Sequence, residues 1–203
     1  MIALIDYGAG NLRSVQKAFE AIGTEVRLTD RAEVVLEAEK VVLPGVGAFG
    51  DGMRGLAERG LIATLVEVAR RRTPLLGICV GMQVLFEESE EHGRHEGLGL
   101  LPGRVRRFDA GALKVPHTGW NQLWRTQGDA PLLEGLDDGA YAYFNHGFFC
   151  DAAPADTAAE TDYGRRYASI VARDGWLFGV QFHPEKSQRV GLAILRNFVE
   201  RRG

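Results

Sequence analysis

The sequence predicts an α/β protein in which an open, mostly parallel sheet is flanked by helices and extended by antiparallel additions in its second half. Three observations support this fold class. The first half alternates short β-rich runs with amphipathic helical runs, as parallel strands joined by crossover helices do. Two apolar runs, at 41–43 and 75–78, end in turns that contain glycine. From Gly103 onward short alternating segments take over, which favours antiparallel pairing.

The first half predicts four strands and their connecting helices. The expected strands are Ile2 to Asp6, Glu25 to Leu28, Val41 to Leu43 and Leu75 to Ile78. The expected helices are Leu12 to Ala21, which Gly23 closes, and Leu61 to Arg72, which ends in three arginines that suit the negative end of the helix dipole. In such sheets ligands bind beyond the carboxyl ends of the strands.

The second half predicts short strands and a final helix. The expected segments are Arg104 to Phe108, Ala142 to His146, Tyr167 to Ala172 and Trp176 to Gln181, followed by a helix from Arg189 to Arg202. No repeat or linker interrupts the chain, and the most loop-like stretch, Asp151 to Asp156, is too short to separate two domains. We therefore expect one domain over residues 1–203.

Composition excludes several classes of protein. The formal net charge is −3, from 24 basic and 27 acidic residues, so no global field attracts nucleic acid or a membrane surface. No apolar run reaches membrane-spanning length. Two cysteines and a strand-like start without signal-peptide features predict reduced thiols and a cytoplasmic location. The five histidines are scattered without metal-ligand spacing, so we expect no metal.

The segment Gly8 to Asn11 follows the first strand and superficially resembles a dinucleotide-binding turn. Arg13 occupies the place of the third glycine of that fingerprint, which excludes the assignment. We expect a turn with a helix cap at Asn11, or a docking surface, and no cofactor.

Cys79 is the candidate nucleophile. Gly77-Ile78-Cys79-Val80-Gly81 follows an apolar strand and precedes the helical-looking Met82 to Phe86, the context of a nucleophile elbow with cysteine in place of serine. A sharp turn crowds the flanking positions, which explains the glycines, and the positive end of the helix dipole stabilises a thiolate. A lone cysteine is more often a buried core residue, but the glycine frame favours the catalytic interpretation.

His183-Pro184-Glu185 follows another strand-like run and is the candidate base with its orienting carboxylate. Proline keeps the preceding residue extended, and residues two apart in an extended chain share a face. Glu185 could then accept from one ring nitrogen of His183 while the other nitrogen faces the thiol. Alone, this tripeptide would more often be a surface turn; together with Cys79 it predicts a triad.

Pro44-Gly45-Val46-Gly47 lies at another strand end, where backbone N–H groups could approach an oxyanion. Such glycine-rich strand ends are often plain turns. We predict that the amides of Gly47 and Val80 form the oxyanion hole.

Together these motifs resemble the class I, triad-type glutamine amidotransferases, whose sheet is flavodoxin-like. The elbow extended to Gly81-Met82-Gln83, the Pro44 to Gly47 loop and His183-Pro184-Glu185 carry this resemblance. Within the class, the chain is similar to the glutaminase subunits of imidazole glycerol phosphate synthases of histidine biosynthesis. That closer resemblance rests on 6–14, 119–121, 143–144 and 185–187, and it runs essentially the whole length.

The resemblance implies that Cys79 attacks the side-chain amide of glutamine, that His183 transfers protons, and that a glutamyl thioester is hydrolysed to glutamate. Gln83 is similar to a substrate-contacting position. The ammonia would pass to a barrel-shaped cyclase subunit that makes imidazole glycerol phosphate and aminoimidazole carboxamide ribotide. The family's partner-facing positions correspond to Asn11, Lys17, Trp120, Tyr143 and Lys186.

The chain departs from the family pattern at two positions. Thr118 stands where the family has methionine, and Gly147 stands where a serine or threonine follows the histidine. The family's recognition of the α-groups of glutamine is therefore not carried over to this chain.

Three other functions remain open at this stage. A free-standing cysteine γ-glutamyl hydrolase would keep the triad, and the glutaminase of another pathway would keep both triad and partner. A flavodoxin-like binding module would not use Cys79 at all, and its thiol would be unreactive.

Overall fold

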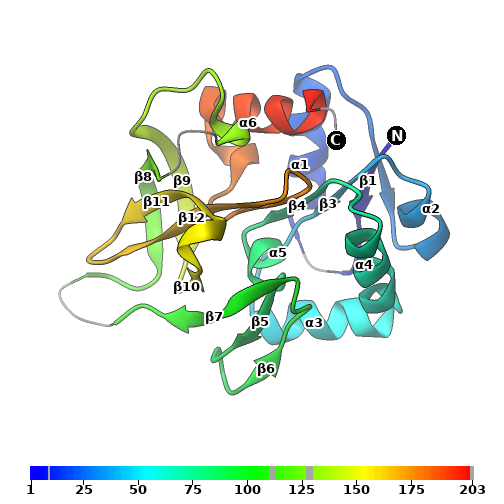
Figure 1. Cartoon of the computed structure of the whole chain (residues 1–203), viewed down its shortest axis with the longest axis horizontal. Coiled ribbons are helices and arrows are strands. Elements are labelled where there is room, and N and C mark those ends of the chain that lie inside the picture. Colours follow the sequence, from blue (N-terminus) through cyan, green and yellow to red (C-terminus); the bar gives the residue numbers. More distant parts are fainter. Residues whose placement is uncertain (9, 110–112, 127–129, 202–203) are drawn as a thin grey trace.

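The computed structural model describes residues 1–8, 10–109, 113–126 and 130–201 (Figure 1). Within these ranges nine strands form one sheet in the order β2-β1-β3-β4-β13-β12-β11-β8-β9. Its parallel half contains β2 (Val26–Thr29), β1 (Ile2–Ile5), β3 (Lys40–Leu43), β4 (Leu75–Ile78) and β13 (Leu177–Val180). Every residue of β1, β4 and β13 is buried, as expected for strands covered on both faces. The predicted fold class is confirmed.

The antiparallel half extends this sheet. It contains β12 (Arg166–Arg173), β11 (Thr157–Asp162), β8 (His117–Arg125) and β9 (Ala140–His146). The predicted segment Trp176 to Gln181 became β13, which is antiparallel to β12 but parallel to β4. The expectation of a purely antiparallel addition is wrong there, because β13 inserts at the centre of the sheet and joins its two halves.

A second, smaller sheet has the order β10-β7-β5-β6 within the described residues. Its strands are β10 (Phe148–Ala152), β7 (Leu101–Arg107), β5 (Phe86–Ser89) and β6 (His95–Glu96). The sequence predicted a helix from Met82 to Phe86, but α5 (Val80–Gln83) is one turn long and Phe86 starts β5. The loop predicted over Asp151 to Asp156 is the end of β10 followed by a 3₁₀ turn, Pro154–Asp156. Local sequence propensity predicted neither β5 nor β10, because both strands form by pairing with β7, which is distant in the sequence.

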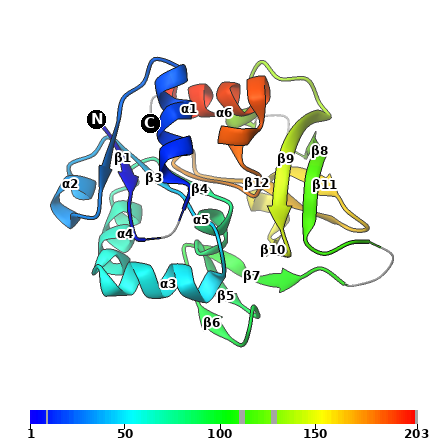
Figure 2. The ribbon, with the colours of Figure 1, turned by 180° about the vertical axis from the view of Figure 1, so that it is seen from behind.

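Helices cover both faces of the main sheet. α1 (Leu12–Ala21) and α6 (Gln188–Glu200) pack together on one face, whereas α2 (Ala32–Leu36), α3 (Phe49–Glu58) and α4 (Leu61–Arg70) pack together on the other (Figure 2). The bounds of α1 match the prediction. α2 and α3 were not predicted: α2 has five residues, and α3 has glycines at three of its ten positions, which weakens a helical pattern.

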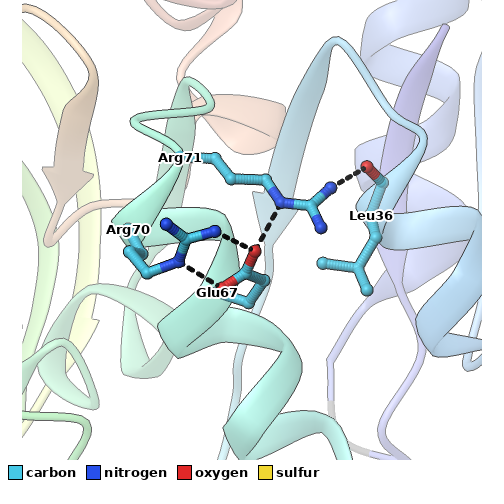
Figure 3. Close-up of polar contacts among 4 residues, drawn as sticks. All are labelled: Leu36, Glu67, Arg70 and Arg71. Atoms are coloured by element: carbon cyan, nitrogen blue, oxygen red, sulfur yellow. Dashed lines mark hydrogen bonds and ion pairs between the residues drawn. The ribbon is translucent and has the colours of Figure 1, made fainter.

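The arginines after α4 have a structural role (Figure 3). Arg70 donates two hydrogen bonds to the Glu67 carboxylate and Arg71 donates a third. Arg71 also donates to the carbonyl oxygen of Leu36, the last residue of α2, at 3.2 Å. These contacts join the ends of α2 and α4, so the predicted structural role of the cluster is confirmed for Arg70 and Arg71.

Across the described ranges, none of the helices combines the length and the apolar character needed to cross a membrane.

Candidate active site

Three neighbouring parallel strands carry the predicted motifs at one edge of the sheet. β3 leads into Pro44 to Gly47, β4 leads into Cys79, and β13 leads towards His183. Because β3, β4 and β13 are parallel and adjacent, their carboxyl ends lie side by side. The fold therefore brings together motifs that are far apart in the sequence.

Cys79 sits on a strained turn between β4 and α5. Its φ is 55° and its ψ is −112°, a combination that side chains other than glycine rarely adopt. Its N–H donates to the carbonyl oxygen of Val180 at 2.8 Å, which fixes the turn against β13. A Cβ at Gly77 or Gly81 would collide with backbone atoms, at Gly81 with the carbonyl of Leu43. The steric reason predicted for the flanking glycines is confirmed.

His183 is held by Glu185. Its Nδ1 lies 2.9 Å from Oε1 of Glu185, and the two side chains are 3% and 1% exposed. A carboxylate oxygen can only accept, so Nδ1 carries a proton, and Nε2 is the ring nitrogen that remains for Cys79. The prediction of an extended chain beyond Pro184 is wrong, because Pro184–Lys186 form a 3₁₀ turn, η3, that brings the carboxylate back to the ring.

The charge on His183 is decided by its anionic neighbours. Burial lowers the pKa of His183, but hydrogen bonds to Cys79 and Glu185, together with their negative charges, raise it to about 10. Oε2 of Glu185 is buried and has no hydrogen-bond partner among the described residues, so Glu185 directs its charge at the imidazole alone. At neutral pH the resting site therefore pairs the imidazolium of His183 with the negatively charged sulfur of Cys79.

The predicted oxyanion groups, Gly47 and Val80, both line a pocket of about 100 Å³ with Cys79 and His183. Gly47 has a φ of 95° and Val46 beside it is 38% exposed. Val80 begins α5, and N–H groups in the first turn of a helix have no partner within the helix. A pocket of this size suits a small substrate.

Gln83, the predicted substrate contact, lines the same pocket. Its amide nitrogen donates to the carbonyl oxygen of Phe148 at 3.1 Å and to Oε1 of Gln181 at 3.2 Å. Both N–H groups are thus engaged, which leaves Oε1 of Gln83 to accept from a ligand.

The sequence reasoning missed three residues of the site. Gln181 is fully buried and directs its amide nitrogen at Sγ of Cys79, 3.9 Å away. Its position two residues before His183 at the end of a strand was the signal for it. His146 and Glu91 also line the pocket, and Glu91 accepts from the N–H of Phe49 at the start of α3 at 2.7 Å. Glu91 ends an acidic stretch that gave no such signal.

Three of the predicted partner-facing residues lie together. The rings of Trp120 and Tyr143 pack edge to face at 6.0 Å, and Nζ of Lys186 lies 5.9 Å from the centroid of the Tyr143 ring. Lys17 on α1 and Asn11 before it are exposed. Asn11 is the N-cap residue of α1, as predicted, although its side chain makes no capping hydrogen bond.

The two departures from the family pattern lie in different places. Gly147 lines the pocket, whereas Thr118 is exposed and donates to Oδ1 of Asn145 at 3.1 Å. Cys150 is a buried free thiol in β10. Within the described ranges, no three His, Cys, Asp or Glu side chains are grouped so that they could hold a metal ion.

Sequence comparison finds close relatives along the whole chain. The family "Glutamine amidotransferase class-I" matches residues 3–201. The imidazole glycerol phosphate synthase subunit HisH of Syntrophotalea carbinolica is 50% identical, with 98% of each chain covered. The subunit of the same name from Sulfurimonas denitrificans is 49% identical, with 100% of this chain and 99% of that one covered.

Structure comparison finds the same fold. A crystal structure of a glutamine amidotransferase superposes with a TM-score of 0.76 at 20% identity, covering 98% of both chains. The PurLQS structure from Thermotoga maritima gives 0.73 at 19% identity, covering 98% of this chain and 96% of that one. At these identities the likeness concerns the fold.

Proposed function

The chain belongs to the class I glutamine amidotransferases, and from that premise we propose that Cys79, His183 and Glu185 release ammonia from glutamine for use by a cyclase subunit. Its function is that of the glutaminase subunit of imidazole glycerol phosphate synthase in histidine biosynthesis, and its activity is glutamine hydrolysis. The convergence of an oxyanion loop, a nucleophile and a base on the ends of β3, β4 and β13 supports these catalytic roles.

In the first half of the reaction, Sγ of Cys79 attacks the side-chain amide carbon of glutamine. The oxyanion that forms accepts from the N–H groups of Gly47 and Val80. His183 starts protonated, because its pKa is about 10, and gives its proton to the departing nitrogen, so ammonia leaves and a glutamyl thioester remains.

In the second half, His183 has become neutral and takes a proton from water, whose oxygen attacks the thioester carbon. The C–S bond breaks, glutamate leaves, and the thiolate and imidazolium are restored. Glu185 holds the ring in one tautomer, and the amide of Gln181 supports the thiolate. The oxygen of Gln83 accepts from an N–H of glutamine.

The relatives are named as subunits of imidazole glycerol phosphate synthase, which supports the proposal that this chain acts in a complex with a cyclase subunit. We propose that this cyclase is barrel-shaped and docks on the surface of Trp120, Tyr143 and Lys186, with Asn11 and Lys17 at its margin. Direct transfer suits the chemistry, since ammonia released to water becomes non-nucleophilic ammonium. We also propose that the enzyme acts in the cytoplasm, where its two free thiols stay reduced, and that residues 1–203 act as one domain.

The central experiment compares glutamate release by the chain alone, with the cyclase subunit, and with cyclase plus its phosphoribosyl precursor. We expect little release by the chain alone and strong release in the full mixture, because the loop at 44–47 controls the oxyanion hole. Losing one oxyanion donor costs roughly 10²–10³ in rate, enough to keep the free subunit nearly silent. Equal rates in all three samples would refute this control.

The same mixture separates the alternatives. A free-standing γ-glutamyl hydrolase would cleave glutamyl peptides without the cyclase, and a glutaminase of another pathway would release glutamate without forming the cyclase products. The chain is about half identical, over nearly its whole length, to the HisH subunits of several organisms, and this favours a cyclase partner over both alternatives.

A further inference from the structure

A buried tyrosine just after the first strand contacts the loop at 44–47. Tyr7 comes shortly after β1, its side chain is 1% exposed, and its hydroxyl donates to the carbonyl oxygen of Pro44 at 2.6 Å. Since β1 and β3 are neighbours, the bond joins the ends of two adjacent strands.

The direction of this hydrogen bond is fixed. Burial, and then the negative charge of Cys79, raise the pKa of Tyr7 far above its usual value. The phenol therefore stays protonated, and a carbonyl oxygen can only accept. The hydrogen bond from Tyr7 to Pro44 therefore persists across the working range of pH. Because the charge of Cys79 contributes to the raised pKa, the phenol of Tyr7 lies close enough to the nucleophile to interact with it electrostatically.

The two glycines of the loop have different surroundings. A Cβ on Gly45 would lie 2.5 Å from the nitrogen of Gly81 and 2.7 Å from the hydroxyl of Tyr7. A Cβ on Gly47 would meet nothing within 4 Å. The Pro44–Gly45 end is thus packed against the elbow and Tyr7, whereas the Val46–Gly47 end has room to turn.

Helix α3 is shaped to admit the tyrosine. Glycine weakens a helix interior relative to alanine, yet α3 contains Gly52 and Gly55. A Cβ on Gly55 would lie 2.5 Å from the carbonyl oxygen of Tyr7 and 3.2 Å from Cδ2 of its ring, whereas one on Gly52 would make only an ordinary contact with the ring, at 3.9 Å. Gly55 thus leaves room for Tyr7, although a glycine at this position makes helix α3 less stable.

We propose that Tyr7 is a positioning residue for glutamine hydrolysis: it holds the Pro44–Gly45 peptide against the elbow, so that only the Val46–Gly47 end turns to present an N–H to the oxyanion. Tyr7 touches no reacting atom and acts through the loop. The inference rests on the proposed function and adds the element that orients its oxyanion hole.

The test is Tyr7→Phe in complex with the cyclase subunit and its phosphoribosyl precursor. The change removes one oxygen and keeps the ring. We expect kcat for glutamate release to fall roughly tenfold, because one neutral hydrogen bond no longer orients the loop, while KM for glutamine stays unchanged. The rate of Cys79 alkylation by iodoacetamide and the cyclase activity with added ammonium salts should also stay unchanged.

The matched control is Tyr163→Phe, which removes a similar bond, from a phenol to the carbonyl oxygen of Lys114 at 2.7 Å, and should keep the wild-type kcat. Equal kcat values for the two variants would overturn the inference. A fall in alkylation, ammonium-driven activity and melting temperature together with kcat would do the same, because it would show a general structural role. A wild-type complex that releases no glutamate would instead refute the proposed function itself.

Discussion

The chain places histidines in two buried regions with opposite charge behaviour. Taken as whole residues, His183, after β13, is 2% exposed, while His117 and His146, on β8 and β9, are 3% and 6% exposed. Burial lowers the pKa of His117 to about 4 and that of His146 to about 3, whereas His183 has a pKa of about 10. Burial is common to all three, so the neighbours decide: Cys79 and Glu185 face His183.

The two neutral histidines, His117 and His146, are joined by hydrogen bonds in which every donor can be assigned. Nδ1 of His146 must donate to the carbonyl oxygen of Phe148 at 2.7 Å, so its Nε2 accepts from the hydroxyl of Tyr167 at 3.3 Å. That hydroxyl in turn accepts from Nδ1 of His117 at 3.2 Å. Aromatic rings surround these hydrogen-bonded side chains, and the ring of Tyr163 stacks on that of His117 with 3.9 Å between the ring centroids. A buried histidine is thus neutral where its partners are neutral and charged where they are anionic.

The largest effect should come from removing one of the anions beside His183. Cys79→Ala should abolish glutamine hydrolysis, on the order of 10⁶-fold if this triad behaves as a serine triad does. The complex should still make product from added ammonium salts, because the cyclase chemistry lies on the other chain. Glutamate release and ammonium-driven product formation are the two measurements.

Cys150→Ala is the matched control for this prediction. Cys150 is equally buried but lies outside the triad, so its variant should keep specific glutaminase activity. Glutaminase activity retained by Cys79→Ala would exclude Cys79 as the nucleophile.

The next effect concerns the other anion. Glu185→Gln should lower kcat by up to roughly 10⁴-fold, because the amide no longer enforces the tautomer or stabilises the imidazolium. KM should change much less, since Glu185 does not line the pocket. Steady-state kinetics and the melting temperature check this, with Glu160→Gln, which loses only its partly exposed pair with Arg166, as control. A lower melting temperature with normal specific activity would show that Glu185 is only structural.

The two regions should also respond to pH with opposite sign. The folded pKa of His183 lies above the ordinary value of 6.5, so its stabilisation is complete below pH 6.5 and is lost as pH rises towards about 10. The folded pKa of His146 lies below 6.5, so its stabilisation is complete above pH 6.5 and is lost as pH falls towards about 3. His117 should follow His146, down to about pH 4.

Nitrogen NMR of the imidazoles at pH 7 checks this directly, with single histidine variants for assignment. His183 should have both ring nitrogens protonated, and His117 and His146 one each. A neutral His183 at pH 7 would remove the distinction between the regions.

The smallest effect should come from breaking the neutral chain. Tyr167→Phe removes the hydroxyl that joins the two histidines and should lower the free energy of unfolding by about 1–3 kcal/mol, because buried ring nitrogens lose their partner. Urea denaturation measures the difference, and Tyr163→Phe, whose hydroxyl bond lies at the surface, should cost less. Equal costs would show that the buried chain adds nothing.

Local motifs were predictable because short-range geometry determines them. The glycines around Cys79 reflect a backbone turn, and His183 and Glu185 are two residues apart, so both features could be recognised in the sequence. The helical continuation after Gln83 could not be judged correctly, because pairing of β5 with the distant β7 overrides local propensity. Gln181 and Tyr7 were missed since each acts on a residue remote in the chain.

The sequence by itself determined the alternation of strands and helices, the elbow at Cys79 and the His183–Glu185 pair, because each depends on neighbouring residues. Only the tertiary structure decided that β13 lies beside β4, which puts His183 next to Cys79. It also decided which histidines carry charge, because a pKa depends on the field of groups that the fold brings together from distant segments.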